Sequence, residues 1–579
     1  MSDLISLFKN DLFKLVKELK DKKIINDFNK KNISIDYSSK SKQGDLSTNV
    51  FLLLNKVHHN TNFDLKDIVI KYLSNIEYIE NVNLAKAGFI NIFIKKKFLF
   101  LKLKNFLVDS EIKNNVTVDK KKINLEFVSA NPTGPIHVAH MRGAILGDVL
   151  ASILENIGHD VTREYYVNDA GSQIFNLGNS LFKRYQQLFN LNIQLIDGEY
   201  PGTYLIPIAK EIKKLNGNKW LKFENIKERE TYFNTFAVKT LIKNIKDDLR
   251  LIDINFDKFT FESKIIKDKI IDKVFYLLED KNLIYEGFLE KPLGDDKNWK
   301  PRKQLLFKST NFNDDLDRAF KKSNGEWTYF ANDASYHYDK YMRGFDKLIN
   351  IWGADHIGYI NRMKSIVDVI SNKKNYLDVF ICQIVRLIKD KKYLKMSKRD
   401  DNFITLKEMY HHVGKDALRY FMISTKSETP MDFNMNKVIE KNKENPVFYC
   451  QYAYARSSSV INKSKEYKKI PNVLDSFDLF DISTISEYEW EIILKILSWP
   501  YVLLQSAESM QPHRITNYLE DLCSHFHSFW NRGKDDNSLR MIDENDIGKT
   551  MSKLIWVYFF KVTLKKIFTI IGISAPESM

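Results

Sequence analysis

Two histidines spaced three residues apart are the side chains of this chain best placed to act on a phosphate. The passage 123–140, INLEFVSANPTGPIHVAH, reads as an apolar strand, a Pro/Gly loop and the start of a helix that carries His137 and His140. A helix N-terminus after a parallel strand offers free backbone N–H groups to phosphate oxygens. An imidazole there can donate a hydrogen bond as negative charge grows on the phosphate. Read alone, such a pair is more often a structural helix cap than a catalytic site.

A second passage supplies positive charge. Residues 395–399 read KMSKR and follow the strand-like stretch 384–388 and the polar turn 390–392. A short loop with two lysines around a serine can swing over a triphosphate and neutralise departing pyrophosphate. The simpler reading is a solvated lysine-rich loop in a basic chain.

The elements that must position these motifs alternate between strands and helices. After the first motif, apolar residues at helical spacing predict a helix that ends at Gly158; they are Ile145, Val149, Ile153 and Ile157. From 113 to 440 the alternation predicts a doubly wound, Rossmann-like α/β domain. An insertion from about 176 to 300 interrupts it and holds a charged helix at 225–252.

The two ends of the chain predict different modules. Residues 1–112 open on an amphipathic helix and continue with strands, which indicates an α+β domain; the apolar face of the helix consists of Leu4, Phe8, Leu12, Leu15 and Leu19. From 441 to 579 the strand signals stop and helical patterns predict an all-α bundle. We therefore expect a multidomain α/β protein of three domains.

Composition narrows the classes of protein further. The chain has 579 residues, and its 89 Lys and Arg against 74 Asp and Glu leave a net charge of +15. That charge favours a polyanionic partner, although biased genome composition produces the same excess of lysine. The 3 cysteines, Cys382, Cys450 and Cys523, indicate neither a disulfide framework nor a zinc site. Without a bilayer-length apolar run or a signal-peptide pattern, we expect a cytoplasmic protein.

Together the two motifs resemble the paired signatures of class I aminoacyl-tRNA synthetases, His-x-Gly-His and Lys-Met-Ser-Lys-Ser. Further passages narrow the resemblance to arginyl-tRNA synthetases; they are SANPTGPIHVAHMRGAILGD, YYVNDAGSQI, YFANDASYHYDKYMRGFDKLINIWGADHIGYI, KMSKRDDNFITL, DALRYFM and SAPESM. The resemblance runs from about residue 40 to Met579. It implies an N-terminal additional domain that grips the tRNA elbow, a class I catalytic domain and a helical anticodon-binding domain.

The resemblance also implies the reaction. L-Arginine and ATP form arginyl-adenylate with release of pyrophosphate, and arginine is then transferred to the 3′ end of tRNA(Arg) with release of AMP. The expected cofactors are ATP and the Mg²⁺ that accompanies it, without structural zinc or another protein-bound metal. We expect a monomer and no membrane association. No residue is predicted to act as a general base.

The resemblance assigns residues to four roles. The catalytic groups are His137, His140, Lys395 and Lys398. The ATP contacts are Pro132, Gly134, His137, Ala139, His140, Gly353, Asp355, Lys395, Met396, Ser397 and Lys398. The arginine contacts are Glu126, Ser129, Asn131, His140, Tyr329, Asp333 and His356. The tRNA contacts are Phe89, Asn91, Tyr452, Tyr454, Arg456, Trp530 and Met579.

Within the arginine set, Asp333 and Tyr329 are expected to hold the guanidinium, a planar fork of donors that requires acceptors around its plane. Three positions depart from the family pattern. Ala139 stands where the first signature has Gly, and its methyl group lies where the adenine is expected. Arg399 replaces the final Ser of the second signature, and His356 stands where the family often has Gln.

Two alternative readings stay open. The first is a class I synthetase for another amino acid, such as the cysteinyl type, which would need a zinc-bound thiolate pocket that three scattered cysteines do not supply. The second is a tRNA-binding protein descended from a synthetase that no longer catalyses, with Ala139 as its only lesion in the motifs. Charging assays with a panel of amino acids separate these readings.

Overall fold

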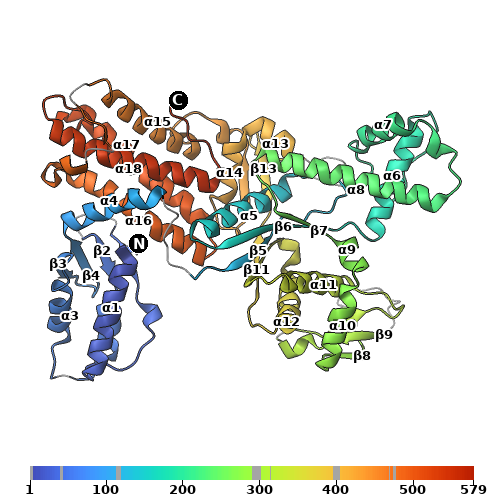
Figure 1. The fold of residues 1–579 in the computed structure, drawn as a ribbon, viewed down its shortest axis with the longest axis horizontal. Helices are drawn as coiled ribbons and strands as arrows, with labels where there is room; N and C mark the ends of the chain where they lie inside the picture. Colours follow the sequence, from blue (N-terminus) through green and yellow to red (C-terminus); the bar gives the residue numbers. More distant parts are fainter. Residues whose placement is uncertain are drawn as a thin grey trace. The chain divides into compact units, whose positions relative to one another are not determined.

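The computed structural model describes residues 4–38, 44–60, 62–111, 119–289, 301–312, 314–394, 404–467, 470–473 and 477–579. The chain divides into two compact units (Figure 1). The first comprises Met1–Asp119, Asn156–Gly158 and Glu440–Met579, and the second comprises Lys120–Glu155 and His159–Ile439.

A five-stranded parallel sheet organises the second unit. Its strands are β5 (Lys122–Glu126), β6 (Asp160–Val167), β7 (Lys258–Phe261), β11 (Lys347–Gly353) and β12 (Leu377–Cys382). The spatial order is β12-β11-β5-β6-β7. The chain thus winds outward from β5 in both directions, and the direction of winding reverses between β5 and β11. Ligands bind outside the carboxyl ends of the strands at such a switch point.

Helices cover both faces of this sheet (Figure 1). Helix α5 (Val138–Asn156) lies on one face, and α11 (Tyr329–Met342) and α12 (Ile360–Ser371) lie on the other. Helix α5 approaches the end of β5 closely, because a Cβ atom at Gly147 would lie 2.2 Å from the Phe127 ring. The sequence prediction of a strand, a loop and a helix ending near Gly158 is confirmed.

The predicted insertion at 176–300 needs a correction, because β7 lies inside that range and forms an edge of the central sheet. Strand β7 has only four residues, so it gives no periodic signal. Between β6 and β7 stand α6 (Ser172–Gln187), α7 (Leu205–Asn216), a 3₁₀ turn (Lys219–Leu221) and α8 (Ile226–Leu251). Helix α8 confirms the charged helix predicted there, and Asn225 caps its N-terminus.

The remaining elements of the second unit form two small sheets and their flanking helices. Strands β8 (Ile284–Phe288), β9 (Lys303–Phe307) and β10 (Arg318–Lys321) form one, beside α9 (Glu262–Lys267), α10 (Ile270–Asp280) and a 3₁₀ turn (Ser309–Phe312). Strands β13 (Val385–Lys389), β14 (Lys392–Tyr393) and β15 (Met431–Asn434) form the other. Helices α13 (Leu406–Val413) and α14 (Lys415–Ile423) stand between β14 and β15 in the chain, and a 3₁₀ turn (Lys437–Ile439) follows β15.

The first unit begins with an α+β domain, as predicted. A four-stranded sheet in the order β1-β2-β4-β3 contains β1 (Ile35–Tyr37), β2 (Leu46–Thr48), β3 (Ile79–Leu84) and β4 (Ile90–Ile94). Its helices are α1 (Leu4–Asp21), α2 (Val50–Val57), α3 (Leu65–Ser74) and α4 (Lys96–Glu111), with a 3₁₀ turn at Lys30–Asn32. All five apolar residues predicted to face the core from α1 are buried.

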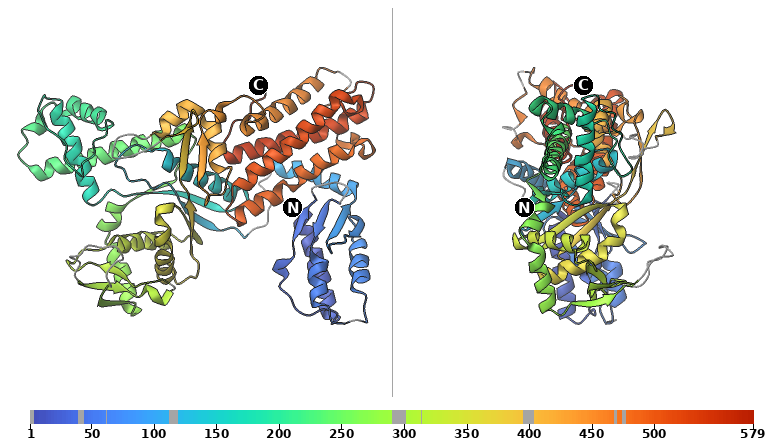
Figure 2. Two further views of the ribbon diagram at one scale, coloured as in Figure 1. Left: turned by 180° about the vertical axis from the view of Figure 1, so that it is seen from behind. Right: turned by 90° about the vertical axis from the view of Figure 1, so that its right-hand side faces the viewer.

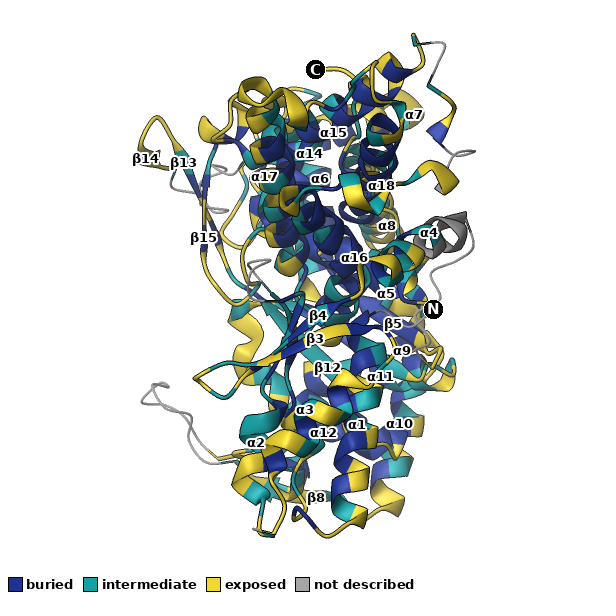
Figure 3. Cartoon of the chain, turned by 90° about the vertical axis from the view of Figure 1, so that its left-hand side faces the viewer, coloured by how far each residue is buried: buried dark blue, intermediate teal, exposed yellow. Residues whose placement is uncertain are grey.

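The C-terminal part of the first unit is helical, which also agrees with the sequence prediction. Helices α15 (Pro446–Ser464), α16 (Glu487–Glu508), α17 (His513–Asp535) and α18 (Ile547–Ile571) run side by side (Figures 1 and 2). Short 3₁₀ turns occupy Phe477–Leu479, Ile482–Thr484 and Asn537–Leu539. Most of α18 is buried, and so is one face of α16 (Figure 3). In the described parts of the chain, no helix is long and apolar enough to cross a membrane.

Candidate active site

The loop after β5 begins with two residues in an unusual backbone conformation. Val128 has φ 68° and Ser129 has φ 40°, in the left-handed region that a β-branched residue rarely adopts. The turn is held by Ser129 Oγ, which donates to Glu126 Oε1 at 2.9 Å and accepts from Tyr166 N–H at 3.1 Å. Residues kept in such a conformation often stand at functional sites. Here the loop follows β5, beside the switch point of the sheet.

In both histidines, the ring nitrogen Nδ1 lies beside a backbone N–H group. The Ala139 N–H donates to His137 Nδ1 at 3.3 Å, and the His137 N–H lies 3.5 Å from His140 Nδ1. A ring nitrogen that accepts carries no proton, so the neutral imidazole of His137 has its proton on Nε2, and His140 follows the same pattern. The two ring centroids lie 4.0 Å apart. In this arrangement the donor of His137 is Nε2–H, which is buried in the structure.

The structure ties the chain after the second motif to the first. Val138 N–H donates to Ile404 O at 3.2 Å, and Leu406 N–H donates to Ile136 O at 2.9 Å. Thr405 also begins α13 in a capping box with Glu408. The motif residues Lys395, Met396, Ser397 and Lys398 themselves lie outside the described residues. The described segment that follows the motif nonetheless hydrogen-bonds to the chain beside the two histidines.

A cavity of about 800 Å³ opens beside the histidines. One wall is the loop after β5, and the other is the segment 195–204 from the insertion. Glu199 anchors that segment, because its carboxylate accepts from Asn179 at 2.6 Å, from Lys183 at 2.9 Å and from Ile196 N–H at 2.8 Å. Tyr204 OH closes the cavity by donating to Thr133 O at 2.5 Å. The volume suits a small ligand of nucleotide size.

A second site, rich in carboxyl groups, is formed by residues of α11 and by the chain directly after β7. Asp333 in the second turn of α11 accepts a hydrogen bond from Tyr359 OH at 2.7 Å, and Glu262, directly after β7, accepts from Asn332 at 3.2 Å. Desolvation, aided by the charges of Glu126 and Glu262, raises the pKa of Asp333 to about 7. Desolvation and Asp169 also raise the pKa of Glu262. Neither carboxyl group has an ion-pair partner among the described residues.

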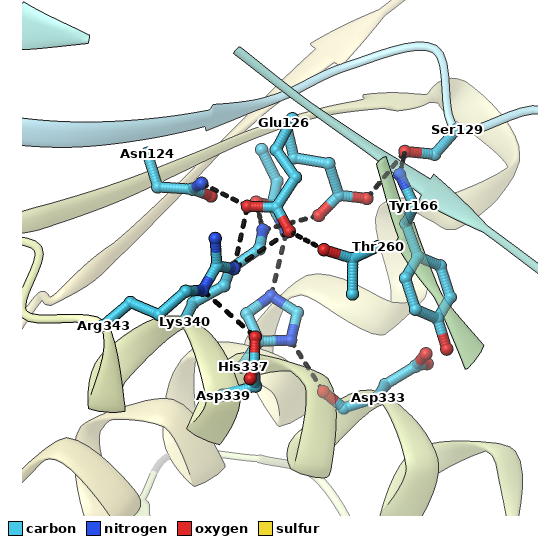
Figure 4. A network of polar contacts seen from close by, with 12 residues as sticks. Asn124, Glu126, Ser129, Tyr166, Thr260, Asp333, His337, Asp339, Lys340 and Arg343 are labelled. Atoms are coloured by element: carbon cyan, nitrogen blue, oxygen red, sulfur yellow. Dashed lines mark hydrogen bonds and ion pairs between the residues drawn. The ribbon is translucent and has the colours of Figure 1, made fainter. Parts of the chain in front are cut away.

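Behind these carboxyl groups, a buried network fixes α11 to the sheet (Figure 4). Lys340 donates to Glu126 at 2.6 Å and to Asn350 at 3.1 Å, and its side chain is fully buried. His337 Nδ1 lies 2.8 Å from Asp333 O, so it donates there and Nε2 accepts from Asn350. Burial and Lys340 lower the pKa of His337 to about 3, which keeps the ring neutral. The network holds the turn that carries Asp333.

The other predicted ATP and arginine contacts surround these two sites. Pro132 is buried, Gly134 lines the cavity, and Asn131 is exposed at its edge. Tyr329 begins α11, one turn before Asp333, and is 71% exposed. Gly353 ends β11, and Asp355 and His356 stand exposed on the following 3₁₀ turn, Ala354–Tyr359, at the carboxyl end of that strand. Ala139 is exposed, so its methyl group is not buried within the protein.

The predicted tRNA contacts lie in the first unit and differ in exposure. Phe89 is 41% exposed and precedes β4, which carries Asn91, and Met579 is 53% exposed at the chain end. Tyr454 is instead 2% exposed and packs against Phe568, so its ring offers no face to a base in this structure. The sequence did not reveal that Tyr454 is buried on α15, because the aromatic residues clustered around it suggested a tRNA contact.

Three of the other predicted contacts meet in one cluster. The Arg456 guanidinium lies 4.2 Å from the Tyr452 ring and 5.1 Å from the Trp530 ring. It donates to Tyr452 OH and to His527 Nδ1, each at 3.1 Å. Because Tyr452, Arg456 and Trp530 are all partly exposed, the cluster forms a cationic aromatic platform at the surface.

Sequence reasoning missed several groups of the carboxyl-rich site. Glu262 could have been found as a carboxylate at the carboxyl end of a parallel strand, but β7 was not recognised as a strand of the central sheet. Tyr359, Lys340 and Asn350 carry no local signal, because only the packing of α11 against β5 and β11 brings them together.

A doubly wound domain with paired histidines at its switch point, joined to a helical C-terminal domain, defines a class I aminoacyl-tRNA synthetase. Three family models match in order: Arginyl tRNA synthetase N terminal domain over residues 4–94, tRNA synthetases class I (R), catalytic domain over 102–449, and DALR anticodon binding domain over 450–579. The chain belongs to the arginyl-tRNA synthetase family. The family and the fold class inferred from the sequence are both confirmed.

Individual proteins agree with this assignment. An arginine–tRNA ligase of Pelagibacter ubique is 41% identical over the full length of both chains. One from Ehrlichia chaffeensis is 40% identical and covers 95% of each chain. A structure described as a putative arginyl-tRNA synthetase from Campylobacter jejuni matches with TM-score 0.73 and 29% identity, over 84% of this chain and 100% of that one. The Thermus thermophilus arginyl-tRNA synthetase shares the fold, with TM-score 0.73 and 18% identity over the whole of both chains.

Proposed function

We propose that this chain activates L-arginine with ATP and transfers it to tRNA(Arg). The observation that carries the proposal is the pair of desolvated carboxyl groups, Asp333 and Glu262. The charge of Glu262 helps to raise the Asp333 pKa, and neither group has an ion-pair partner among the described residues. Desolvated carboxyl groups with raised pKa values, set close together, are what a site built for a permanent cation should show. The guanidinium group of arginine is such a cation.

The pocket selects arginine by matching acceptors to its guanidinium. Asp333, Glu262 and the Tyr329 hydroxyl are proposed to surround the planar fork, with Tyr359 holding the Asp333 carboxylate in place. Ser129, Asn131, His140 and His356 are proposed to orient the α-amino and carboxylate end, while Glu126, held by Lys340, steadies Ser129. Lysine would leave several of these acceptors unpaired, and such sites discriminate by ~10⁴–10⁵.

In the first step, an oxygen of the arginine carboxylate attacks the α-phosphorus of ATP. The bond to the bridging oxygen of the β-phosphate breaks, and pyrophosphate leaves with its electron pair. His137 and His140 stabilise the growing charge with their Nε2–H donors, and Lys395 and Lys398 neutralise the pyrophosphate. The ATP lies in the cavity of about 800 Å³, with Gly353, Asp355, Met396 and Ser397 as further contacts.

Mg²⁺ is proposed to arrive with the ATP phosphates and to neutralise part of their charge. No group of three or more His, Cys, Asp or Glu side chains that could hold a metal was found in the described parts of the chain. The phosphate oxygens would therefore supply its ligands, and no chemical step is assigned to it.

In the second step, the terminal ribose hydroxyl of the tRNA, by family resemblance the 2′-OH, attacks the activated carbonyl and AMP leaves. A groove of about 1320 Å³ between α6 and α8 reaches Asp169 and Ser263 at the edge of the carboxyl-rich site. Lys239, Lys243 and Arg250 line it at intervals of about one or two helical turns. We propose this groove for the single-stranded acceptor end, whose phosphates those cations would contact.

The first unit is proposed to bind the rest of the tRNA. Phe89 and Asn91 of the domain 1–112 would contact the tRNA elbow, and the platform of Tyr452, Arg456 and Trp530 in the domain 441–579 would stack anticodon bases, with Met579 as a further contact. Tyr454 is left out of this interface because it is buried. We further propose that the enzyme works as a monomer in the cytoplasm, where its tRNA substrate is used.

Arginine affinity should fall at low pH. The pKa of Asp333 is about 7 without a cation beside it, and a bound guanidinium favours the ionised form and lowers that pKa. Binding is therefore weakened as pH falls below about 7, by up to about tenfold per unit, and releases about half a proton at pH 7. Calorimetric titration with arginine in buffers of different ionisation enthalpy measures both quantities. Equal affinity between about pH 6 and 8 would contradict this assignment.

The direct test of the function is arginine-dependent exchange of pyrophosphate into ATP by the purified chain, with and without tRNA(Arg). We expect exchange with arginine and not with lysine or cysteine. Exchange only in the presence of tRNA would show that activation is coupled to tRNA binding. No exchange under either condition would favour the non-catalytic alternative and point to Ala139.

A further inference from the structure

The hydroxyl of Tyr166 is buried and has no hydrogen-bond partner among the described residues. Tyr166 lies on β6, and its backbone N–H donates to Ser129 Oγ at 3.1 Å. Its ring stacks on Tyr336 of α11 with centroids 4.2 Å apart and planes 26° apart. The side chain is thus fixed at both its backbone and its ring. A fixed, buried and unpaired hydroxyl lowers the stability of the folded protein. Its presence therefore suggests that a ligand serves as its hydrogen-bond partner.

The hydroxyl points into the carboxyl-rich site. Figure 4 shows the Tyr166 ring directed toward the end of the network where the Asp333 carboxyl lies. Burial, followed by the negative charges of Glu262, Asp333, Glu126 and Asp169, raises the Tyr166 pKa. These four carboxyl groups therefore lie near enough to act on the phenol group, which remains protonated. The site has many acceptors, and a cation with several donors would satisfy them together.

We propose that the Tyr166 hydroxyl is a further specificity-determining group for arginine: its oxygen accepts from a guanidinium N–H while its proton is donated to the Asp333 carboxylate. This inference rests on the proposed function and adds to it a residue to which neither the sequence motifs nor the proposed contacts gave a role. A guanidinium has five donors and no acceptor, so a neutral hydroxyl set between carboxylates can take one N–H without adding charge. A lysine ammonium would place fewer donors in that plane.

The same geometry predicts what the hydroxyl does for folding. A hydroxyl that pairs within the folded protein stabilises it, and its removal destabilises the protein. The Tyr166 hydroxyl pairs with nothing in the described structure, so a Tyr166→Phe substitution keeps the Tyr336 stack and removes a buried unpaired group. The variant should melt at the same temperature as the parent or higher. An activity loss with that melting behaviour would come from ligand contact and not from misfolding.

The test compares Tyr166→Phe with the parent in arginine-dependent pyrophosphate exchange with tRNA present. We expect kcat/KM for arginine to fall by about 10- to 100-fold, the range for a lost hydrogen bond to a charged group. The KM for ATP should stay within about twofold, because the histidine cavity is untouched. Tyr336→Phe is the matched control. Its ring belongs to the same stack, and its hydroxyl is also buried without a hydrogen-bond partner among the described residues, but the nearby charges are those of Glu126, Glu164 and Arg343 and not those of Asp333 and Glu262. It should keep the arginine parameters of the parent.

Agmatine separates the two ends of the substrate, because it carries the guanidinium without the α-carboxylate. As a competitive inhibitor, it should lose affinity for Tyr166→Phe by the same factor as arginine does. Asn131→Ala removes a proposed contact to the α-amino and carboxylate end and leaves the Ser129–Tyr166 hydrogen bond in place, so it should weaken arginine while agmatine inhibits as before. That pattern would assign the Tyr166 effect to the guanidinium.

Three results would overturn the inference: unchanged arginine kcat/KM in Tyr166→Phe, unchanged agmatine inhibition, or an equal loss in Tyr336→Phe. The proposed function survives each of them, because the parent remains active with arginine. A parent that shows no arginine-dependent exchange would instead defeat the proposed function, and this inference with it.

Discussion

An Asp333→Asn variant is expected to lose about 10³-fold in kcat/KM for arginine, since removing one partner of a buried ion pair commonly costs about 3–5 kcal/mol. The substituted amide would still fill the space and could accept one hydrogen bond from Tyr359. It would lack the charge that the guanidinium requires. Its NH₂ group would also place hydrogen-bond donors against the N–H donors of the guanidinium. Steady-state exchange at several arginine concentrations measures the loss.

The same variant should be at least as stable as the parent at neutral pH. The folded-state pKa of Asp333, about 7, lies above its unfolded value, so the folded chain binds more protons than the unfolded chain between about pH 4 and 7. Stability from this group is therefore present at low pH and is lost progressively as pH rises from about 4 to 7. The amide does not ionise, so the variant does not lose this stability as pH rises. The melting temperature of the variant should therefore exceed that of the parent by more at about pH 8 than at about pH 5.

Asp378→Asn is the matched control for this pair of measurements. Asp378 lies on β12 of the same sheet, and its carboxylate pairs with Lys347 at 2.8 Å with 35% of the side chain exposed. The chemical change is identical, but no substrate pocket is involved. Equal losses of arginine activity in the two variants would show that Asp333 acts through the fold alone.

The sequence predicted the elements that carry the histidine loop because their signals are local. The apolar run of β5, the Pro/Gly loop and the helical spacing of α5 follow one another directly along the chain, and each appears where it was expected. The second motif was equally readable, and its described flank returns to Ile136 and Val138. Local patterns suffice where one strand-loop-helix unit forms the site.

The carboxyl-rich site could not be read in this way, because it is assembled from β7, α11 and the turn after β11. Glu262 became meaningful only when the four-residue strand before it joined the sheet. Tyr166 is one aromatic residue in a strand, and nothing in its neighbours in the sequence shows that its hydroxyl ends among carboxyl groups. Conversely, Tyr454 sits in an aromatic run that suggests base stacking, while helix packing buries it. Long-range packing decides the surroundings of Glu262, Tyr166 and Tyr454 alike.

The tautomer of His137 leads to the second large effect. Ala139 N–H occupies Nδ1, so the catalytic donor is proposed to be Nε2–H, which reaches the phosphate as the transition state forms. A His137→Ala variant should lose about 10²- to 10³-fold in kcat for exchange, the usual cost of one such donor. The KM for arginine should change little, because the imidazole contributes to the transition state and not to guanidinium binding.

Two amide substitutions can distinguish the ring nitrogens. The side-chain amide of Gln reaches the position of Nε2 and can donate there, whereas the shorter Asn amide reaches only the position of Nδ1. His137→Gln should therefore keep substantially more kcat than His137→Asn, and His137→Asn should resemble His137→Ala. The reverse order would mean that Nδ1 faces the phosphate and that the Ala139 contact breaks when ATP binds. Because both amides are neutral and similarly polar, the difference between them reports geometry, which is the property that the loop after β5 is strained to provide.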